Sequence, residues 1–159
     1  MVIHTGLGYD IHRLCPGEGM KILGTFIPCP YKVVSHSDGD LGFHALSNAI
    51  LSAVGLEDIG TYFSDKAIET AGMDSAKILL SAVRMAKERG YKVVNVVVDI
   101  IAEAPRLEGY KKQMKENLSR ILSLDVDAVS VHANTKEKTG AVGKKEAIEC
   151  LSSVLVSKD

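Results

Sequence analysis

The chain has 159 residues, of which 46% are apolar and 25% are charged, and this composition suits one globular domain spanning residues 1–159. Its net charge of −1 lacks the basic excess that nucleic-acid-binding proteins carry. The sequence shows no signal peptide or membrane span, and its three cysteines lack metal-site spacing. We therefore expect a cytoplasmic protein with reduced thiols and with neither nucleic acid nor membrane as a partner.

The first two predicted elements are short strands. Residues 2–8 and residues 21–28 are rich in apolar and β-branched side chains. Proline and glycine between residues 16 and 19 suggest a turn. The pattern therefore predicts a hairpin made of these two strands.

The next segment predicts an amphipathic helix. Apolar side chains recur at helical spacing across residues 41–53, and Gly55 is placed to end the helix. Ser37 or Asp38 could cap its first turn. Residues 56–73 have no clear periodicity, so we expect a loop there.

The second half alternates helices and strands. Residues 74–90 are expected to form a second helix, and residues 91–105 a long strand rich in valine and isoleucine. A third helix should begin at Pro105, followed by a fourth strand over residues 127–135. The last predicted element is a helix over residues 144–156.

This order predicts an α+β fold with a mixed four-stranded sheet and helices packed on one face. The third strand is apolar on both faces, from Val93 to Ile101, and therefore needs cover on both sides. A neighbouring subunit could cover the second face. Alternatively, the four helices could divide between the two faces.

Asp10 and His12, in the segment "GYDIHRL" at residues 8–14, suggest a metal site. Side chains two residues apart on an extended segment point to the same side. A carboxylate and an imidazole are ordinary zinc ligands, although two polar residues at a strand end are also common. His44 on the first predicted helix is the candidate third ligand, although a lone histidine there is more often a partly buried hydrogen-bonding residue. Three protein ligands with an open fourth position are typical of catalytic zinc.

Three further polar segments could bind an anionic substrate. The segment "SHSDGD" at residues 35–40 precedes a helix, where exposed N–H groups favour phosphates. Residues 58–65 and 133–140 combine hydroxyl, amide and charged groups, and Glu137 could hold a harder cation such as magnesium. Taken alone, the last two segments are more often solvated loops than binding sites.

The combination of five sequence segments is specific to one protein family. The chain contains "GYDIHRL", "HSDGDLGFHAL", "DIGTYFSD", "IIAEAPRL" and "TKEKTG", in this order. In order and spacing they resemble the 2-C-methyl-D-erythritol 2,4-cyclodiphosphate synthase family, and the resemblance covers essentially the whole chain. It implies an enzyme of the non-mevalonate isoprenoid route that forms a cyclic diphosphate from a cytidine diphosphate-linked substrate and releases CMP. It also implies a homotrimer whose sheets face each other and whose active sites lie between subunits.

The resemblance implies a role for each matching residue. Zn²⁺ would be bound by Asp10, His12 and His44, and Mg²⁺ or Mn²⁺ by Glu137, while His36 and Thr135 would stabilise the transition state. Substrate contacts are expected from Asp10, His12, His36, Ser37, Asp58, Ile59, Gly60, Phe63, Ser64, Asp65, Lys66, Ala67, Ala102, Ala104, Pro105, Arg106, Leu107, Glu108, Asn134, Thr135, Lys136, Glu137, Ala141 and Lys144.

The chain departs from the family pattern at several positions. Asn48 stands where the family usually has aspartate, and Asn134 where threonine is common. Ala141 replaces an aromatic residue, Lys144 an arginine and Arg106 a frequent lysine. These changes affect expected substrate contacts and the trimer axis, and they leave the three zinc ligands intact.

Two other functions remain open at this point. A zinc-dependent phosphohydrolase could use the same ligands with water as the nucleophile, and it would give a hydrolysed product. A non-catalytic trimeric module that binds metal and nucleotide is the third possibility. Such a module would be expected to lack polar groups around the metal, whereas His36, Asp65, Thr135 and Glu137 are present here.

Overall fold

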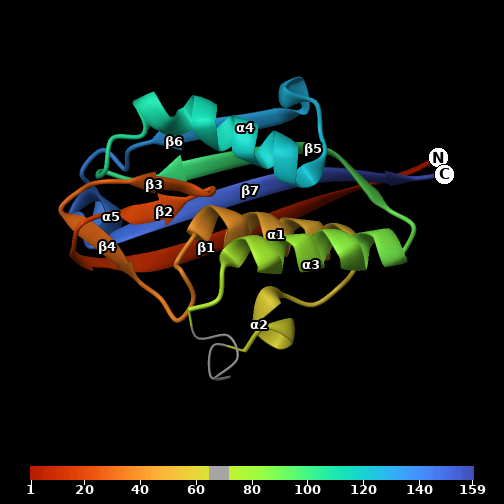
Figure 1. The fold of residues 1–159 in the computed structure, drawn as a ribbon, viewed down its shortest axis with the longest axis horizontal. Helices are drawn as coiled ribbons and strands as arrows, with labels where there is room; N and C mark the ends of the chain where they lie inside the picture. Colours follow the sequence, from red (N-terminus) through yellow and green to blue (C-terminus); the bar gives the residue numbers. More distant parts are fainter. Residues whose placement is uncertain (65–71) are drawn as a thin grey trace.

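The computed structural model describes residues 1–64 and 72–159 and shows an α+β fold built on one mixed sheet (Figure 1). Its five strands lie in the order β4-β1-β7-β5-β6, with β5 and β6 parallel and the other pairs antiparallel. The strands are β1 (Val2–Pro16), β4 (Tyr31–Val34), β5 (Lys92–Ile101), β6 (Val129–Asn134) and β7 (Ala147–Lys158). The α+β prediction is confirmed, but the sheet has five strands rather than four.

The three long helices pack against one face of this sheet. They are α1 (Leu41–Ala53), α3 (Ser75–Glu88) and α4 (Lys111–Leu122), and α1 lies between the sheet and α3. Shorter helices are α2 (Ile59–Tyr62), α5 (Gly140–Gly143) and the 3₁₀ turns Glu108–Tyr110 and Val126–Ala128. The predicted helices at 41–53 and 74–90 are thus present, and α2 lies inside the segment predicted as loop.

The predicted hairpin of residues 2–8 with 21–28 is wrong. The first strand continues to Pro16 and pairs with β4 and β7. Residues 21–28 instead contain a small hairpin of their own, made of β2 (Met20–Ile22) and β3 (Thr25–Ile27). Its turn residues Leu23 and Gly24 have φ values of 49° and 75°, as tight hairpin turns require.

The predicted last helix over residues 144–156 is also wrong, because this segment forms the central strand β7. Alternate side chains from Ile148 to Val156 face the helices and are buried. One of them is Ser152, whose hydroxyl donates to the Val97 carbonyl at 3.1 Å. This buried serine interrupts the apolar alternation and makes the segment look helical in sequence.

The first helix is capped by Asp40 rather than by Ser37 or Asp38. The Asp40 carboxylate accepts from the N–H of Phe43 and also from the N–H groups of Leu23 and Gly24, at 2.8 Å each. Asp40 is fully buried, so these three donors replace its water. The cap thereby ties the start of α1 to the β2–β3 turn.

Two glycines bring α1 unusually close to β1. A Cβ atom at Gly6 would overlap the carbonyl oxygen of Ala49, and one at Gly8 would overlap that of Ala45. Strand periodicity places Asp10 on the same side as Gly6 and Gly8. The close approach therefore brings the side chains of α1 within reach of those at the middle of β1.

The other face of the sheet carries no helix among the described residues. Leu7, Tyr9, Ile11 and Leu151 are exposed there, with 63% of Leu7 accessible to solvent. Val97 shares this face and is only partly buried. We call these residues the open face. The predicted apolar third strand is only partly apolar on this face, because Asn95 and Asp99 of β5 flank Val97 there, and the exposed apolar side chains come mainly from β1 and β7.

No helix in the described part of the chain is long and apolar enough to cross a membrane.

Candidate metal centre and active-site pockets

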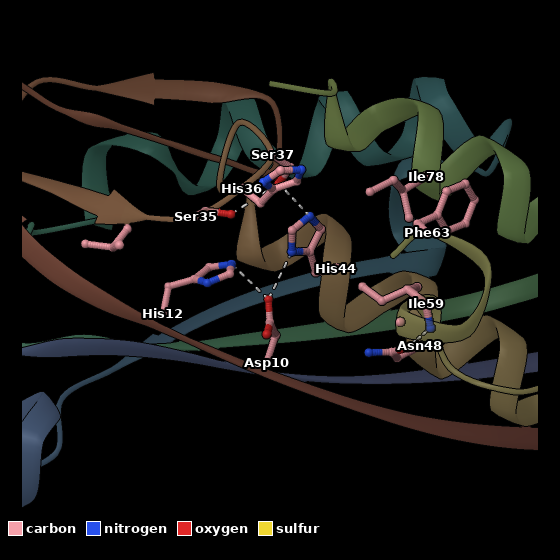
Figure 2. A pocket seen from close by; sticks show the side chains of 12 residues that line it. Asp10, His12, Ser35, His36, Ser37, His44, Asn48, Ile59, Phe63 and Ile78 are labelled. Atoms are coloured by element: carbon pink, nitrogen blue, oxygen red, sulfur yellow. Dashed lines mark hydrogen bonds and ion pairs between the residues drawn. The ribbon is translucent and has the colours of Figure 1, made fainter. Parts of the chain in front are cut away.

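Asp10, His12 and His44 meet at one point between β1 and α1 (Figure 2). The Oδ2 atom of Asp10 lies 3.0 Å from Nε2 of His12 and 3.2 Å from Nδ1 of His44. The candidate ligand atoms of all three lie within 4.8 Å of one another. The sequence-predicted trio is therefore assembled in one chain, in an arrangement suited to a divalent metal ion.

The electrostatics of the trio also suit a cation. Burial raises the pKa of Asp10, but its contacts with the two imidazoles outweigh burial and lower the pKa to about 2. Nε2 of His12 is buried and makes no hydrogen bond despite its position beside Asp10. A buried nitrogen of this kind needs a partner, and a cation bound by the trio would supply one.

A second layer of polar groups lies behind His44. Its Nε2 atom is 2.8 Å from Oγ of Ser75 and 3.2 Å from Oγ of Ser37. The Ser75 hydroxyl donates in turn to Asp38. Burial raises the pKa of Asp38, but hydrogen bonds led by that of Ser75 outweigh burial, so the net shift is downward.

The trio lies in a cavity that we call the histidine pocket. Its other described lining residues come from the segment before α1, from α1 itself and from the α2 and α3 segments. They are Val34, Ser35, His36, Ser37, Asn48, Ile59, Gly60, Phe63 and Ile78. Most of the predicted substrate contacts between residues 10 and 63 therefore share one cavity.

The α2 segment is held against this pocket by two side-chain caps. Asn48 accepts a hydrogen bond from the Ile59 N–H at 2.9 Å. Asp58 caps α2 by accepting from the Thr61 N–H at 3.1 Å. Asp58 is exposed and lines a neighbouring surface hollow together with Asn48 and Tyr9. Asn48 thus links the helix that carries His44 to the segment at 58–60 that was predicted to contact substrate.

Most of the predicted residues between 102 and 135 line a separate cavity, which we call the loop pocket, whereas Lys136 and Glu137 follow its lining residue Thr135 and are not part of the lining. The loop pocket lies at the ends of β5 and β6 and shares no described lining residue with the histidine pocket. Its lining residues are Ala102, Glu103, Pro105, Arg106, Leu107, Glu108, Lys111, Ala133, Asn134 and Thr135. One chain therefore brings the predicted substrate contacts together as two groups rather than one.

Backbone hydrogen bonds shape the loop pocket. The Glu103 carboxylate accepts from the N–H groups of Lys136 and Lys138, at 3.1 and 2.9 Å. Glu137 lies between these donors with a positive φ of 51°, and its side chain is exposed near Thr135. Lys136 forms an ion pair with Glu149 at 2.9 Å. The Glu103 carboxylate therefore fixes the backbone of the segment that carries the predicted magnesium ligand.

A few predicted contacts lie outside both pockets. Ala104 precedes Pro105 in a cis peptide bond and is half-buried, and Ser64 is exposed. Asp65, Lys66 and Ala67 lie outside the described residues. Ala141 lines a third hollow with Ile11 and Arg13, and Lys144 is exposed just after α5.

Comparison with known proteins identifies the family. The YgbB family model matches residues 3–157. The chain belongs to the YgbB family. A protein of Solibacter usitatus named 2-C-methyl-D-erythritol 2,4-cyclodiphosphate synthase is 41% identical over 98% of this chain and 98% of its own length.

Solved structures agree with this membership. The bifunctional IspDF from Campylobacter jejuni superposes with a TM-score of 0.95 at 34% identity, and the alignment covers 99% of this chain and 43% of that one. Plasmodium falciparum IspF in its CDP complex has a TM-score of 0.86 at 34% identity, with 99% and 97% of the two chains covered. The YgbB fold is thus shared along the whole chain.

Some residues that build this YgbB site were not predicted from sequence as site residues. The sequence predicts Ser75 only as part of a helix, Asp38 as a possible helix cap and Glu103 only as part of a long strand. Each acts on a group that is remote in sequence, since 31 residues separate Ser75 from His44 and 33 separate Glu103 from Lys136. The only sequence signal for Ser75, Asp38 and Glu103 as site residues is that they are polar residues next to apolar strand and helix segments.

Proposed function

We propose that this chain converts 4-diphosphocytidyl-2-C-methyl-D-erythritol 2-phosphate to 2-C-methyl-D-erythritol 2,4-cyclodiphosphate and CMP, as a lyase of non-mevalonate isoprenoid biosynthesis. The observation that carries the proposal is the trio Asp10, His12 and His44 inside a polar cavity, in a chain of the YgbB family. The named relative from Solibacter usitatus and the CDP complex of Plasmodium falciparum IspF support the substrate class.

The reaction is an intramolecular phosphoryl transfer. An oxygen of the 2-phosphate forms a bond to the β-phosphorus of the diphosphate. The bond from the β-phosphorus to the bridging oxygen breaks, and CMP leaves with that oxygen. Both reacting groups are anions, so positioning and charge stabilisation carry most of the catalysis.

We propose that the trio holds Zn²⁺. Two imidazole nitrogens and one carboxylate oxygen are a common three-ligand set for catalytic zinc. When bound, the ion supplies Lewis-acid polarisation of a phosphate oxygen. The chain contributes the rigid geometry, because β1 fixes Asp10 and His12 while α1 fixes His44.

The protein groups proposed to stabilise the developing charge come from both pockets. His36 and Ser37 line the histidine pocket beside the trio. The Thr135 hydroxyl lies in the loop pocket and can donate to a phosphate oxygen once it turns from Glu137, which is 3.5 Å away. Removing one donor of this kind typically lowers the rate by about 10²–10³-fold.

A second cation is proposed at Glu137. Its carboxylate is exposed, and carboxylate oxygen is the ligand type that Mg²⁺ and Mn²⁺ prefer. Such ions usually keep several waters and take one or two carboxylates together with substrate phosphates. This arrangement explains how a single glutamate, held in place by Glu103, can suffice.

We further propose a homotrimer with its active sites between subunits. The open face exposes four large apolar side chains, Leu7, Tyr9, Ile11 and Leu151, with Tyr9 paired to Leu151 across β1 and β7, and exposed apolar groups of this kind favour an interaction site. Each chain carries a histidine pocket and a separate loop pocket. Packing open faces together would bring the loop pocket of one chain to the histidine pocket of the next.

The free thiols of Cys15, Cys29 and Cys150 fit a reducing, cytoplasmic setting.

The reaction is tested by incubating the protein with the substrate and magnesium and recording phosphorus NMR spectra. We expect the signals of a cyclic diphosphate and of CMP in equal amounts. A hydrolysed, acyclic product would contradict the proposal and would favour a phosphohydrolase that uses water as the nucleophile.

The shared site is tested by mixing two inactive variants. His44→Ala damages the histidine pocket, and Thr135→Ala damages the loop pocket. In randomly mixed trimers, about a quarter of the interfaces would combine an intact histidine pocket with an intact loop pocket. We therefore expect about a quarter of the wild-type rate after co-expression. Absence of any recovery in verified mixed trimers would place both pockets of each site in one chain.

A further inference from the structure

We propose that Ser75 and Asp38 are positioning residues that fix the orientation of His44 for metal binding. The proposal rests on the metal ion assigned above to Asp10, His12 and His44. It concerns groups that would not touch the ion or the substrate. Ser75 is the first residue of α3, and Asp38 lies in the segment before α1, so the network joins three parts of the fold at His44.

The direction of the hydrogen bonds carries the argument. Ser75 has one hydroxyl proton, and it donates that proton to Asp38. The Ser75 oxygen, 2.8 Å from Nε2 of His44, must therefore accept from the imidazole. The Nε2 atom then carries a proton, so a neutral His44 keeps a free electron pair on Nδ1. Nδ1 is the atom that faces Asp10 at 3.2 Å.

The far end of this network is firmly held. Asp38 also accepts from the N–H of Asp40 at 3.2 Å and pairs with Lys21 of β2 at 3.4 Å. Ser75 is fully buried, so water does not compete for its hydroxyl. A serine held in this way has one favourable rotamer, and it transmits that constraint to the ring of His44.

Ser37 offers a weaker alternative partner. Its Oγ is 3.2 Å from Nε2 of His44 and 3.4 Å from Oγ of Ser75, and it also accepts from the Gly39 N–H. Ser37 lies closer to the cavity and is proposed to meet substrate, so it would be drawn away from His44 during turnover. Ser75 lines neither pocket and remains available throughout.

The test measures zinc affinity with the full-length chain, by competition with a chromophoric chelator. Loss of such a supporting partner typically weakens metal binding by about 10–100-fold. We expect this loss for Ser75→Ala. Asp38→Asn keeps an acceptor oxygen for Ser75 but removes the charge, so we expect a smaller loss. Cobalt in place of zinc should show a shifted visible spectrum in Ser75→Ala.

Ser47→Ala is the matched control. Ser47 is also a fully buried serine near His44, but its hydroxyl donates to the Phe43 carbonyl within α1. We expect its zinc affinity and cobalt spectrum to match the wild type. Folding is checked by circular dichroism, and Asp38→Asn carries the test if Ser75→Ala does not fold.

The outcomes separate the two proposals. Wild-type protein that binds no zinc would overturn the proposed ion, and the positioning role with it. Wild-type zinc binding that is unchanged in folded Ser75→Ala and Asp38→Asn would overturn the positioning role alone. Equal weakening by Ser75→Ala and Ser47→Ala would also overturn it, because the effect would then come from general packing.

Discussion

The histidine pocket and the loop pocket are built in opposite ways. In the first, the candidate ligands are side chains on regular elements: His44 is only 7% exposed, and Asp10 and His12 lie in a long strand. In the second, the lining residue Thr135 begins a largely exposed segment that runs to Lys138, and the shape of this segment depends on hydrogen bonds from its backbone to the Glu103 carboxylate.

This contrast suggests that the two pockets have different functions. A metal site needs its ligands fixed within a few tenths of an ångström, and packed helices and strands provide that precision. A diphosphate and a hydrated magnesium ion tolerate a looser frame, because water completes their contacts. Substitutions in the histidine pocket should therefore act through packing and zinc, and those in the loop pocket through substrate and magnesium.

The largest effect is expected where the histidine pocket depends on close packing. In Gly8→Val the new side chain would overlap the Ala45 carbonyl and push α1 away from β1. We expect a loss of at least about 3 kcal/mol in the free energy of unfolding, together with loss of zinc. Urea unfolding and metal analysis measure both. Gly109→Ala is the control, because a Cβ there meets no atom within 4 Å.

The second prediction separates the two proposed metal ions, zinc at the trio and magnesium at Glu137. His44→Ala removes a proposed nitrogen ligand, so the variant should contain less zinc than the wild type. The magnesium concentration needed for half-maximal rate should not change. Glu137→Gln keeps the side-chain size and removes the charge. It should raise the magnesium concentration needed for half-maximal rate and leave zinc content unchanged. If Glu137→Gln instead strips zinc, Glu137 belongs with the trio and the contrast between the pockets fails.

The trio Asp10, His12 and His44 was predictable from sequence because the strand and the helix that carry it both show a clear periodicity. Asp10 and His12 are two apart on a strand, and His44 lies on a helix whose apolar residues repeat clearly. The strand at 147–158 was not predictable, because the buried Ser152 disguised its alternation. The supports Ser75 and Glu103 were missed since they act across more than 30 residues of chain. Periodicity reports local structure and says little about which polar groups meet.

A third prediction tests the backbone frame of the loop pocket. Glu103→Ala leaves the N–H groups of Lys136 and Lys138 without their acceptor, so Glu137 should lose its fixed position. We expect kcat/KM to fall about 10-fold, since hydrogen bonds to a charged group contribute about 1.5–3 kcal/mol and water replaces part of that. Zinc content should not change. A variant with wild-type kinetics would show that the loop holds its shape without Glu103.

The smallest effect is expected at Asn48, which joins α1 to the α2 segment. Asn48→Asp restores the residue usual in the family and retains an acceptor oxygen for the Ile59 N–H, 2.9 Å away in the wild type. The geometry of α2 should therefore persist, and the added charge lies one helical turn beyond His44. We expect kcat to change by less than about 3-fold, with zinc content unchanged, because a net free-energy change below about 0.7 kcal/mol corresponds to that ratio. Steady-state kinetics with the cytidine substrate measures the change. Complete loss of turnover would instead mean that this pocket is built around a neutral amide, and that the charge of Asn48→Asp disturbs the trio directly.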